Sequence, residues 1–144
     1  MKVITLKQPW ATLVAEGLKK YEFRSWKYNY RGEILIHAGA GIDREAIKRY
    51  EHLNFEFPAK RIIAKVVIED CIKLTPKISK EINMTNPLVY GEKIRDGYAW
   101  KLANVEKIYL DKIVPGKQGI WNYEKTVKNW KIIILDTVLD TVWW

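Results

Sequence analysis

Short runs in which apolar and polar residues alternate are the clearest pattern along the chain, and they predict β-strands. The first run, residues 2–6, begins almost at the first residue. Further runs with strand character are residues 20–26, 33–38, 61–74, 98–110 and 131–135. The run at 61–74 is the longest, and the step Glu69-Asp70-Cys71 interrupts its alternation, which predicts a β-bulge at that point.

Helical segments are fewer and are marked by the residues at their ends. Pro9 and Gly17 predict a short helix near residues 9–16, because proline suits the first turn of a helix and glycine suits a left-handed end. Asp43 can cap a second helix that runs to about Leu53.

The remaining connections are long and contain most of the glycine and proline. Residues 39–41 predict a break in the chain, residues 115–121 a turn, and residues 75–97 a loop with one short helix. Several strands with two or three short helices predict an α+β fold with a mixed, curled sheet, and they fit an alternating parallel α/β sheet poorly. We expect all 144 residues to form a single domain.

Positive charge gathers in one part of the chain. The net charge is +8, and residues 17–31 hold five cationic residues against one acidic residue, so half of the net charge lies there. Tyr21, Trp26, Tyr28 and Tyr30 are interleaved with these cations. Cations that meet phosphates beside rings that stack on bases are typical of RNA-binding surfaces. Core aromatics beside solvated lysines are the alternative for each single residue.

The composition gives little support to other chemistries. Cys71 is the only cysteine, and His37 and His52 are the only histidines, so we expect no disulfide, no metal site and no cofactor. The sequence G-K-Q-G at residues 116–119 lacks the spacing of a Walker phosphate loop. No apolar run is long enough to span a membrane, and the N-terminal residues lack a secretion signal, so we expect a cytoplasmic protein.

The leading candidate site is the group Lys19, Glu22 and Arg24, which follows Gly17 directly. Glu22 and Arg24 are two residues apart on a predicted strand, so their side chains share a face and can form a charge-assisted pair. Lys19 joins them only if it lies in the turn after Gly17. A surface salt bridge with no ligand is the structural alternative.

The spacing G-x-K-x-x-E-x-R at residues 17–24 resembles the signature of the ASCH family, the activating-signal-cointegrator homology domains of the PUA-like superfamily. Other segments resemble the ASCH subgroup that is related to the endothelial-overexpressed, LPS-associated-factor proteins. They are residues 6–10, 24–26, 29–32, 36–39, 97–100 and 116–121. The resemblance covers residues 1–124 and implies a PUA-like mixed β-barrel decorated with short helices.

The same resemblance implies a cleft that binds RNA or a nucleotide-like ligand. The residues expected to contact it are Lys19, Glu22, Arg24, Trp26, Tyr30, Arg31, Gln8 and Trp10. The cations would meet phosphate, and Trp26 or Tyr30 would stack on a base. Trp10 and Trp100 are further stacking candidates, and burial in the core is the alternative for each tryptophan.

An enzyme is the alternative function, because some bacterial ASCH proteins are amidohydrolases that act on N4-acetylcytidine. The resemblance makes Lys19 the base or nucleophile, and Glu22 would be the carboxylate that moves protons. Those enzymes have threonine where this chain has Glu22, and they use a further glutamate, for which Glu69 and Asp70 are the candidates here. A module that binds only proteins, with the signature as a structural salt bridge, is a third class.

The C-terminal residues 125–144 lie outside the resemblance. Residues 130–144 are strongly apolar and end in Trp143 and Trp144. An exposed apolar edge strand of this kind would aggregate. We therefore expect this extension to pack on the barrel or to form a homodimer interface.

Overall fold

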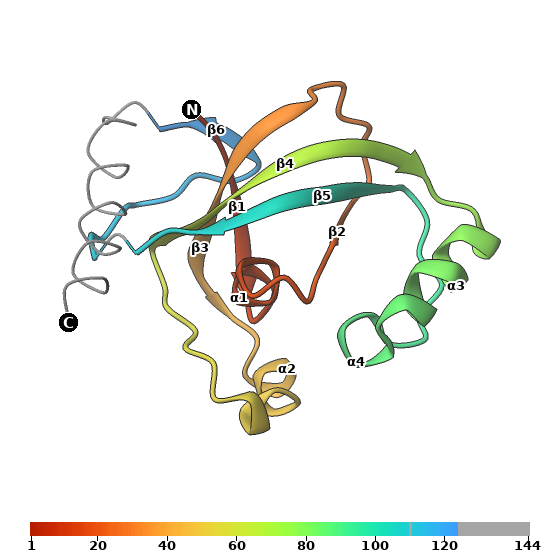
Figure 1. The fold of residues 1–144 in the computed structure, drawn as a ribbon, viewed down its shortest axis with the longest axis horizontal. Coiled ribbons are helices and arrows are strands. Elements are labelled where there is room, and N and C mark those ends of the chain that lie inside the picture. The colour runs from red at the N-terminus through yellow and green to blue at the C-terminus, as the bar shows by residue number, and fades with distance from the viewer. Residues whose placement is uncertain (110, 124–144) are drawn as a thin grey trace.

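A computed structural model describes residues 1–109 and 111–123 of the chain. Six strands form one sheet in the order β2-β5-β4-β3-β1-β6 (Figure 1). The strands are β1 Lys2–Gln8, β2 Tyr21–Arg24, β3 Gly32–Ile42, β4 Arg61–Lys73, β5 Tyr98–Lys107 and β6 Ile120–Asn122. The helices are α1 Trp10–Ala15, α2 Arg44–Lys48, α3 Pro76–Thr85 and α4 Pro87–Tyr90, with a 3₁₀ turn η1 at Glu51–Leu53.

The sheet is mixed and curls strongly, as Figure 1 shows for the long strands β4 and β5. Strands β1 and β3 are parallel, and every other neighbouring pair is antiparallel. Strands β2 and β6 are the two edges, and no backbone pairing among the described residues joins them. The predicted α+β class with a mixed sheet is therefore confirmed, and strand pairing among the described residues does not show the closure of the sheet into a barrel.

The main core lies between α1 and the strands. Helix α1 contacts β1, β3, β4 and β5. Its residues Ala11 and Val14 are fully buried, and they belong to one cluster with Ile36 of β3, Val66 of β4 and Trp100 of β5. Removal of these apolar side chains from water is the main force that holds the helix against the curled sheet.

The turn after α1 determines where β2 begins. Gly17 has a φ of 77°, so it ends the helix in the left-handed conformation that the sequence predicts. The backbone N–H groups of Leu18 and Lys19 both donate to the carbonyl of Leu13, at 2.9 and 3.0 Å. The chain therefore reverses tightly, and Lys19 lies in the turn rather than on the strand.

Strand β4 contains the predicted bulge. Its pairing with β5 shifts register between Ile68 and Asp70, and Glu69 and Asp70 are both exposed. The side chain of Glu69 pairs with Lys101 at 3.9 Å. The predicted β-bulge is confirmed.

Strand β3 does not end at the glycines where the sequence predicts a break. It continues to Ile42, and its parallel pairing with β1 reaches Gln8. A Cβ atom at Gly39 would lie 2.8 Å from the Thr5 Cγ2 atom, closer than real Cβ contacts. Glycine is present here because β1 side chains lie against the strand, and it extends the sheet instead of breaking it.

The segment 75–97 holds two helices where one short helix was predicted. The Thr75 hydroxyl accepts from the N–H of Ile78 at 3.2 Å, and the Asn86 side chain accepts from the N–H of Val89 at 3.4 Å. Each cap is followed directly by a proline in the first helical turn. Proline in this segment favours a loop in the sequence pattern, but the pairs Thr75-Pro76 and Asn86-Pro87 begin helices in the structure.

The helix predicted from Asp43 to about Leu53 is divided in two. The Asp43 carboxylate accepts from the N–H of Ala46 at 3.0 Å, which confirms the predicted cap. Helix α2 ends at Lys48, and η1 follows after Tyr50, whose ring is buried.

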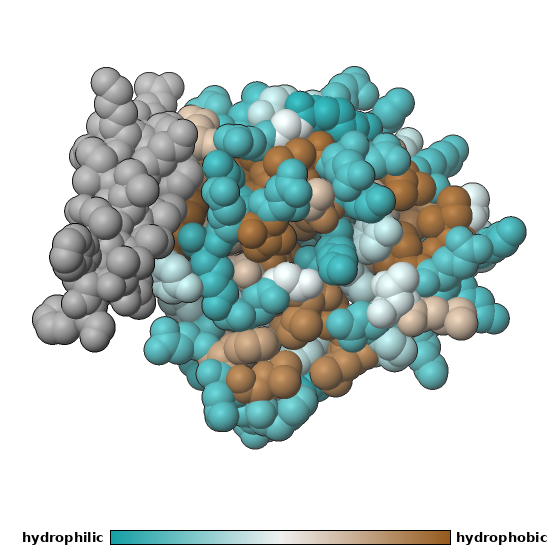
Figure 2. Space-filling view, viewed as in Figure 1, coloured by the Kyte–Doolittle hydropathy of each residue, from teal (hydrophilic) through white to brown (hydrophobic). Residues whose placement is uncertain are grey.

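Within residues 1–109 and 111–123, no helix is long and apolar enough to cross a membrane. On the face drawn in Figure 2, apolar side chains reach the surface in patches that hydrophilic residues separate. The strand predicted at residues 131–135 lies outside the described residues.

Candidate functional site

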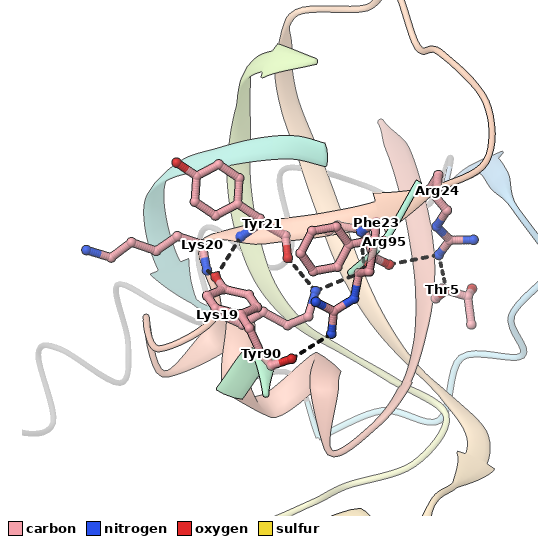
Figure 3. Close-up of polar contacts among 9 residues, drawn as sticks. Thr5, Lys19, Lys20, Tyr21, Phe23, Arg24, Tyr90 and Arg95 are labelled. Carbon is pink, nitrogen blue, oxygen red and sulfur yellow. Dashed lines mark hydrogen bonds and ion pairs between the residues drawn. The ribbon is translucent and has the colours of Figure 1, made fainter. Parts of the chain in front are cut away.

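The three signature residues form one continuous ion-pair network, and Figure 3 shows its two cations, Lys19 and Arg24, on either side of β2 residues. The Lys19 ammonium donates to Glu22 Oε1 at 3.0 Å and also to the backbone carbonyl of Tyr21. Arg24 Nη2 donates to the other carboxylate oxygen of Glu22 at 3.0 Å. Lys19 lies in the turn after Gly17, which is the position that the sequence pattern requires for its side chain to reach Glu22.

This network is largely withdrawn from solvent. The side chain of Lys19 is 5% exposed and that of Glu22 is 12% exposed, whereas that of Arg24 is 25% exposed. Glu22 Oε1 also accepts from the backbone N–H of Phe23 at 3.1 Å. The carboxylate is therefore saturated by donors, and Arg24 is the member of the network that reaches solvent.

The charges in the network have opposite effects on its two buried groups. Burial lowers the pKa of Lys19 more than Glu22 raises it, and the nearby charges of Arg95 and Arg24 lower it further. Burial raises the pKa of Glu22, but the charges and hydrogen bonds of Lys19 and Arg24 outweigh it and bring this pKa below its ordinary value. The network has two cations for one carboxylate. Glu22 therefore stays ionised, and the excess positive charge makes the protonated form of Lys19 less favourable.

Phe23 and Arg95 support the network from the other face of β2. The Phe23 ring contacts two cations, with Lys19 Nζ 5.1 Å and the Arg95 guanidinium 4.3 Å from its centroid. Arg95 is held by Asn83 Oδ1 and by the carbonyl of Tyr90, both at 2.9 Å. No sequence pattern marks Arg95, since it lies in the segment 75–97, for which the pattern predicts a loop with one short helix.

A large cleft opens beside Arg24, with a volume of about 1030 Å³. We call it the basic cleft. It is lined by Thr5, Leu6, Lys7, Arg24, Trp26, His37, Gly39, Ala40, Gly41, Lys60, Ile113, Pro115, Gly116, Lys117, Gln118 and Gly119. Four of these residues are cationic, and no acidic residue of the described chain lines the cleft.

The cations come from segments that are far apart in the sequence. Lys7 is on β1, Arg24 ends β2, Lys60 precedes β4, and Lys117 lies just before β6. A hydrogen bond of 2.8 Å from the N–H of Val114 to the carbonyl of Lys60 joins two of these segments. The three lysines are exposed and form no ion pair with any described residue, so their charge is directed to solvent and to whatever enters the cleft.

A hydrogen-bonded chain lines one side of the basic cleft. His37 Nε2 lies 2.6 Å from the Val114 carbonyl, which can only accept, so Nε2 carries the proton. His37 Nδ1 then accepts from the Thr5 hydroxyl at 3.2 Å, and that hydroxyl accepts from Trp121 Nε1 at 2.9 Å. Burial lowers the pKa of His37 more than its bond to Val114 raises it, so the ring is neutral near pH 7. His37 thus joins β1 to the segment that holds Val114, and its ring also lines the cleft.

Trp26 provides the aromatic wall of the cleft. It is 40% exposed, and its ring meets that of Trp100 edge-on at 4.9 Å. Trp100 is fully buried and is stacked on Tyr28, with ring centroids 5.0 Å apart. Of the tryptophans proposed as stacking platforms, Trp26 is thus the one that faces the cleft, and Trp100 belongs to the core.

The other predicted contact residues lie outside the basic cleft. Gln8 is fully buried and bonds the carbonyl of Pro58 and the N–H of Thr12, so it holds α1 in place. Trp10 packs against a second apolar cluster. The hydroxyl of Tyr30 donates to the Glu33 carbonyl at 2.8 Å.

Arg31 also points elsewhere. Its guanidinium donates to the carbonyls of Tyr28 and Tyr30 and lies 3.8 Å from Asp70. Asp70 and Glu69, the candidates for a further carboxylate, are thus each paired with other cations on the bulge of β4. The described residues contain no group of histidine, cysteine and acidic side chains that could hold a metal ion.

Sequence reasoning missed three cations of the cleft, Lys7, Lys60 and Lys117. The nearest signal for Lys117 is the glycine-flanked sequence at residues 116–119, which predicts a turn and lacks the spacing of a Walker phosphate loop. It lines the cleft, although it has no Walker geometry. Lys7 and Lys60 carry no local signal, since only the folding of β1 against β3 and the chain before β4 brings them together.

Comparisons with known proteins agree on the family. A family model described as the ASCH domain matches residues 4–113. Two crystal structures of variants of ZmASCH from Zymomonas mobilis have the same fold. A serine-to-alanine variant is 16% identical with a TM-score of 0.57, covering 93% of this chain and 94% of that one. A tyrosine-to-phenylalanine variant is 17% identical with a TM-score of 0.51, covering 93% and 96%.

A search of curated proteins found no match. The matches name the family without a subgroup, so the finer assignment made from the six segments between residues 6 and 121 stays a prediction. A family match that spans most of the chain, together with the shared fold, gives the assignment its basis. The chain belongs to the ASCH domain family.

Proposed function

We propose that the protein binds single-stranded RNA, or a nucleotide-like ligand, in the basic cleft. The observation that carries this proposal is the lining of the cleft, with four cations and no acidic residue among the described ones. Backbone phosphates supply most of the affinity of a nucleic acid, and Lys and Arg are the groups that neutralise them. The ASCH family is generally linked to RNA binding, which agrees with this ligand class.

The cleft divides into a phosphate side and a base side in this proposal. Lys7, Lys60 and Lys117 are exposed around it and would follow the phosphates. Trp26 offers an exposed ring for a base, and stacking of this kind contributes about 1–3 kcal/mol per base. Single-stranded RNA fits such a cleft because its unpaired bases can be splayed out.

Arg24 connects the cleft to the buried network. Its Nη2 group donates to Glu22 at 3.0 Å and lies 3.4 Å from the carbonyl of Thr5 on β1. The guanidinium is thus fixed before a ligand arrives, so little side-chain freedom is lost on binding. In this proposal, Lys19 and Glu22 position Arg24 and do not touch the ligand themselves.

Titration of a labelled single-stranded RNA at several salt concentrations tests the binding role. Four phosphate contacts predict that log K falls with log salt at a slope of about −2 to −3, since each phosphate of a single strand contributes about −0.7. The triple variant Lys7→Ala, Lys60→Ala and Lys117→Ala should weaken binding strongly and reduce the slope to about −0.7.

A charge-matched control uses three exposed lysines on α2 and α3, replaced as Lys48→Ala, Lys77→Ala and Lys80→Ala. It loses the same charge away from the cleft and should keep most of the affinity and the slope. Absence of binding at low salt would refute the proposal. Equal losses in the two triple variants would place the RNA on another surface.

Hydrolysis of an amide on a modified nucleoside such as N4-acetylcytidine is the second candidate, and one observation favours it. Burial lowers the pKa of Lys19, which makes its amine easier to deprotonate for a role as base or nucleophile. Against it, Lys19 is buried and Arg24, not Lys19, lines the cleft. Incubation with N4-acetylcytidine and chromatography of the products tests this, with Lys19→Met as the inactive variant. No turnover above the uncatalysed rate would eliminate that substrate.

A further inference from the structure

Three buried side-chain polar atoms among the described residues have no hydrogen-bond partner, and their residues either line the basic cleft or contact the ring of Trp26 on its wall. They are Arg24 Nε, the Tyr28 hydroxyl and Trp100 Nε1. Buried polar groups are nearly always paired in native proteins, so each exception needs an explanation. Three exceptions in one place indicate a single cause.

The three residues are neighbours in space. Trp100 is paired with Glu22 across β5 and β2, and Arg24 follows two residues later on the same face of β2. Tyr28 stacks on Trp100, and Trp26 contacts both rings, at 4.9 Å from Trp100 and 5.7 Å from Tyr28. Arg24 and Trp26 thus line the cleft together, whereas Tyr28 and Trp100 contact the ring of Trp26 without lining the cleft.

All three atoms are donors. The indole and guanidinium N–H groups can only donate, and the Tyr28 hydroxyl donates as long as it keeps its proton. Burial and the neighbouring Tyr30 both raise the pKa of Tyr28, so its hydroxyl is protonated at neutral pH. A group that satisfied this wall would therefore present acceptors, and the aromatic rings around it favour a planar group.

We propose that the wall formed by Arg24, Tyr28 and Trp100 is a base-selective subsite that takes the carbonyl edge of a keto-bearing nucleobase such as uracil. This inference rests on the proposed function, since it names the base that the RNA presents there. Uracil presents two carbonyl acceptors, whereas adenine presents only ring-nitrogen acceptors and places an amino donor beside them, so it would pair fewer of these donors. The base reaches them when Trp26 tilts off Trp100, and the indole of Trp26 makes no hydrogen bond to a described residue that would resist this movement.

The experiment compares three RNA hexamers of identical charge: hexauridylate, hexaadenylate and an abasic hexamer. Binding is measured by fluorescence anisotropy of labelled hexamers at one low salt concentration. Hexauridylate should bind about tenfold tighter than hexaadenylate, the discrimination expected from one or two base contacts. The abasic hexamer reports the contribution of the phosphates alone.

Tyr28→Phe removes one donor and nothing else, so it should reduce the uridine preference at least threefold. Its thermal stability should not fall, because the hydroxyl it removes has no partner. Tyr50→Phe is the matched control, since its buried hydroxyl donates to the Leu88 carbonyl at 3.0 Å. That variant should lose stability and keep the uridine preference.

The outcomes separate this inference from the proposed function. If all three hexamers bind equally well, the cleft binds RNA and the base-selective subsite is refuted. A uridine preference that Tyr28→Phe leaves unchanged refutes the assignment of the donor wall. If no hexamer binds, both the proposed function and the inference fall together.

Discussion

At the scale of single residues, Glu22 is the position where burial and charge interact most strongly. Its carboxylate accepts three hydrogen bonds, from Lys19, Arg24 and the backbone N–H of Phe23, while its side chain is only 12% exposed. Removal of one member of a buried ion pair leaves the other charge uncompensated. The effect of a substitution at Glu22 should therefore differ in kind from that at a surface pair.

Glu22→Gln should lower the free energy of unfolding by about 3 kcal/mol, because Lys19 and Arg24 keep their charges and lose the carboxylate. Urea denaturation followed by circular dichroism measures this. Glu45→Gln is the control, since Glu45 pairs with Lys48 in an exposed setting with side chains 84% and 64% exposed. That change should alter stability by no more than about 0.5 kcal/mol. Similar losses in both variants would contradict the account of the network.

His37 makes the stability of the fold depend on pH. Its folded-state pKa lies below its ordinary value of 6.5, so the unfolded chain takes up a proton first as the pH falls. Between pH 6.5 and the folded pKa the unfolded state binds more protons, so stability falls with falling pH and is fully present above 6.5.

Denaturation at a series of pH values measures this loss. In His37→Gln the decline that begins below pH 6.5 should be smaller than in the wild type, whatever the variant's own stability. His52→Gln, which changes an exposed histidine, should keep the wild-type profile. Identical profiles in all three proteins would show that His37 does not cause the decline.

At the scale of elements, the contact between β1 and β3 explains why β3 contains glycine at residue 39 and still continues to Ile42. Gly39→Ala would place a methyl group 2.8 Å from Thr5 Cγ2. Overpacking of this kind costs about 1–3 kcal/mol. Thr5→Ser removes that methyl group and keeps the hydroxyl that bonds His37 and Trp121.

The double variant Gly39→Ala with Thr5→Ser should therefore recover much of the stability that Gly39→Ala loses. Thermal unfolding of the two single variants and the double variant gives the coupling between the sites. Strict additivity of the two single changes would mean that this contact is not what requires glycine.

Local patterns predict most elements of this fold, the buried ion-pair network and two residues of the cleft, Arg24 and Trp26. Alternation locates β1, β2 and β4, and Gly17 fixes the turn that carries Lys19 to Glu22. The pattern fails where a tertiary contact decides, as at Gly39, or where a proline begins a helix, as in α3 and α4. Lys7 and Lys60 share no local pattern, because only the assembled sheet places them on one cleft.

At the scale of the whole molecule, the sequence beyond Tyr123 predicts a contribution to stability or to assembly. An apolar groove of about 290 Å³ involves Val114, Trp121 and Tyr123, directly before that segment. Residues 125–144 lie outside the described residues, and their apolar sequence predicts that they pack on the domain or join two copies of it.

Truncation after Glu124 should reduce solubility and thermal stability, and it should halve the solution mass if the segment forms a dimer. Light scattering and thermal unfolding of the full and truncated chains measure both effects. A truncated protein with the same stability, solubility and mass state would show that the extension is neither core nor interface.

The contact of Arg24 with the Thr5 carbonyl has a consequence for how this protein can change over evolution. The same guanidinium fastens the edge strand β2 to β1 and lines the cleft. A substitution of Arg24 that changes the affinity for the ligand also removes this contact between β2 and β1. Selection therefore cannot change the affinity and the stability of the fold independently at this position. New specificities would have to arise first at the lysines around the cleft, which the fold does not need.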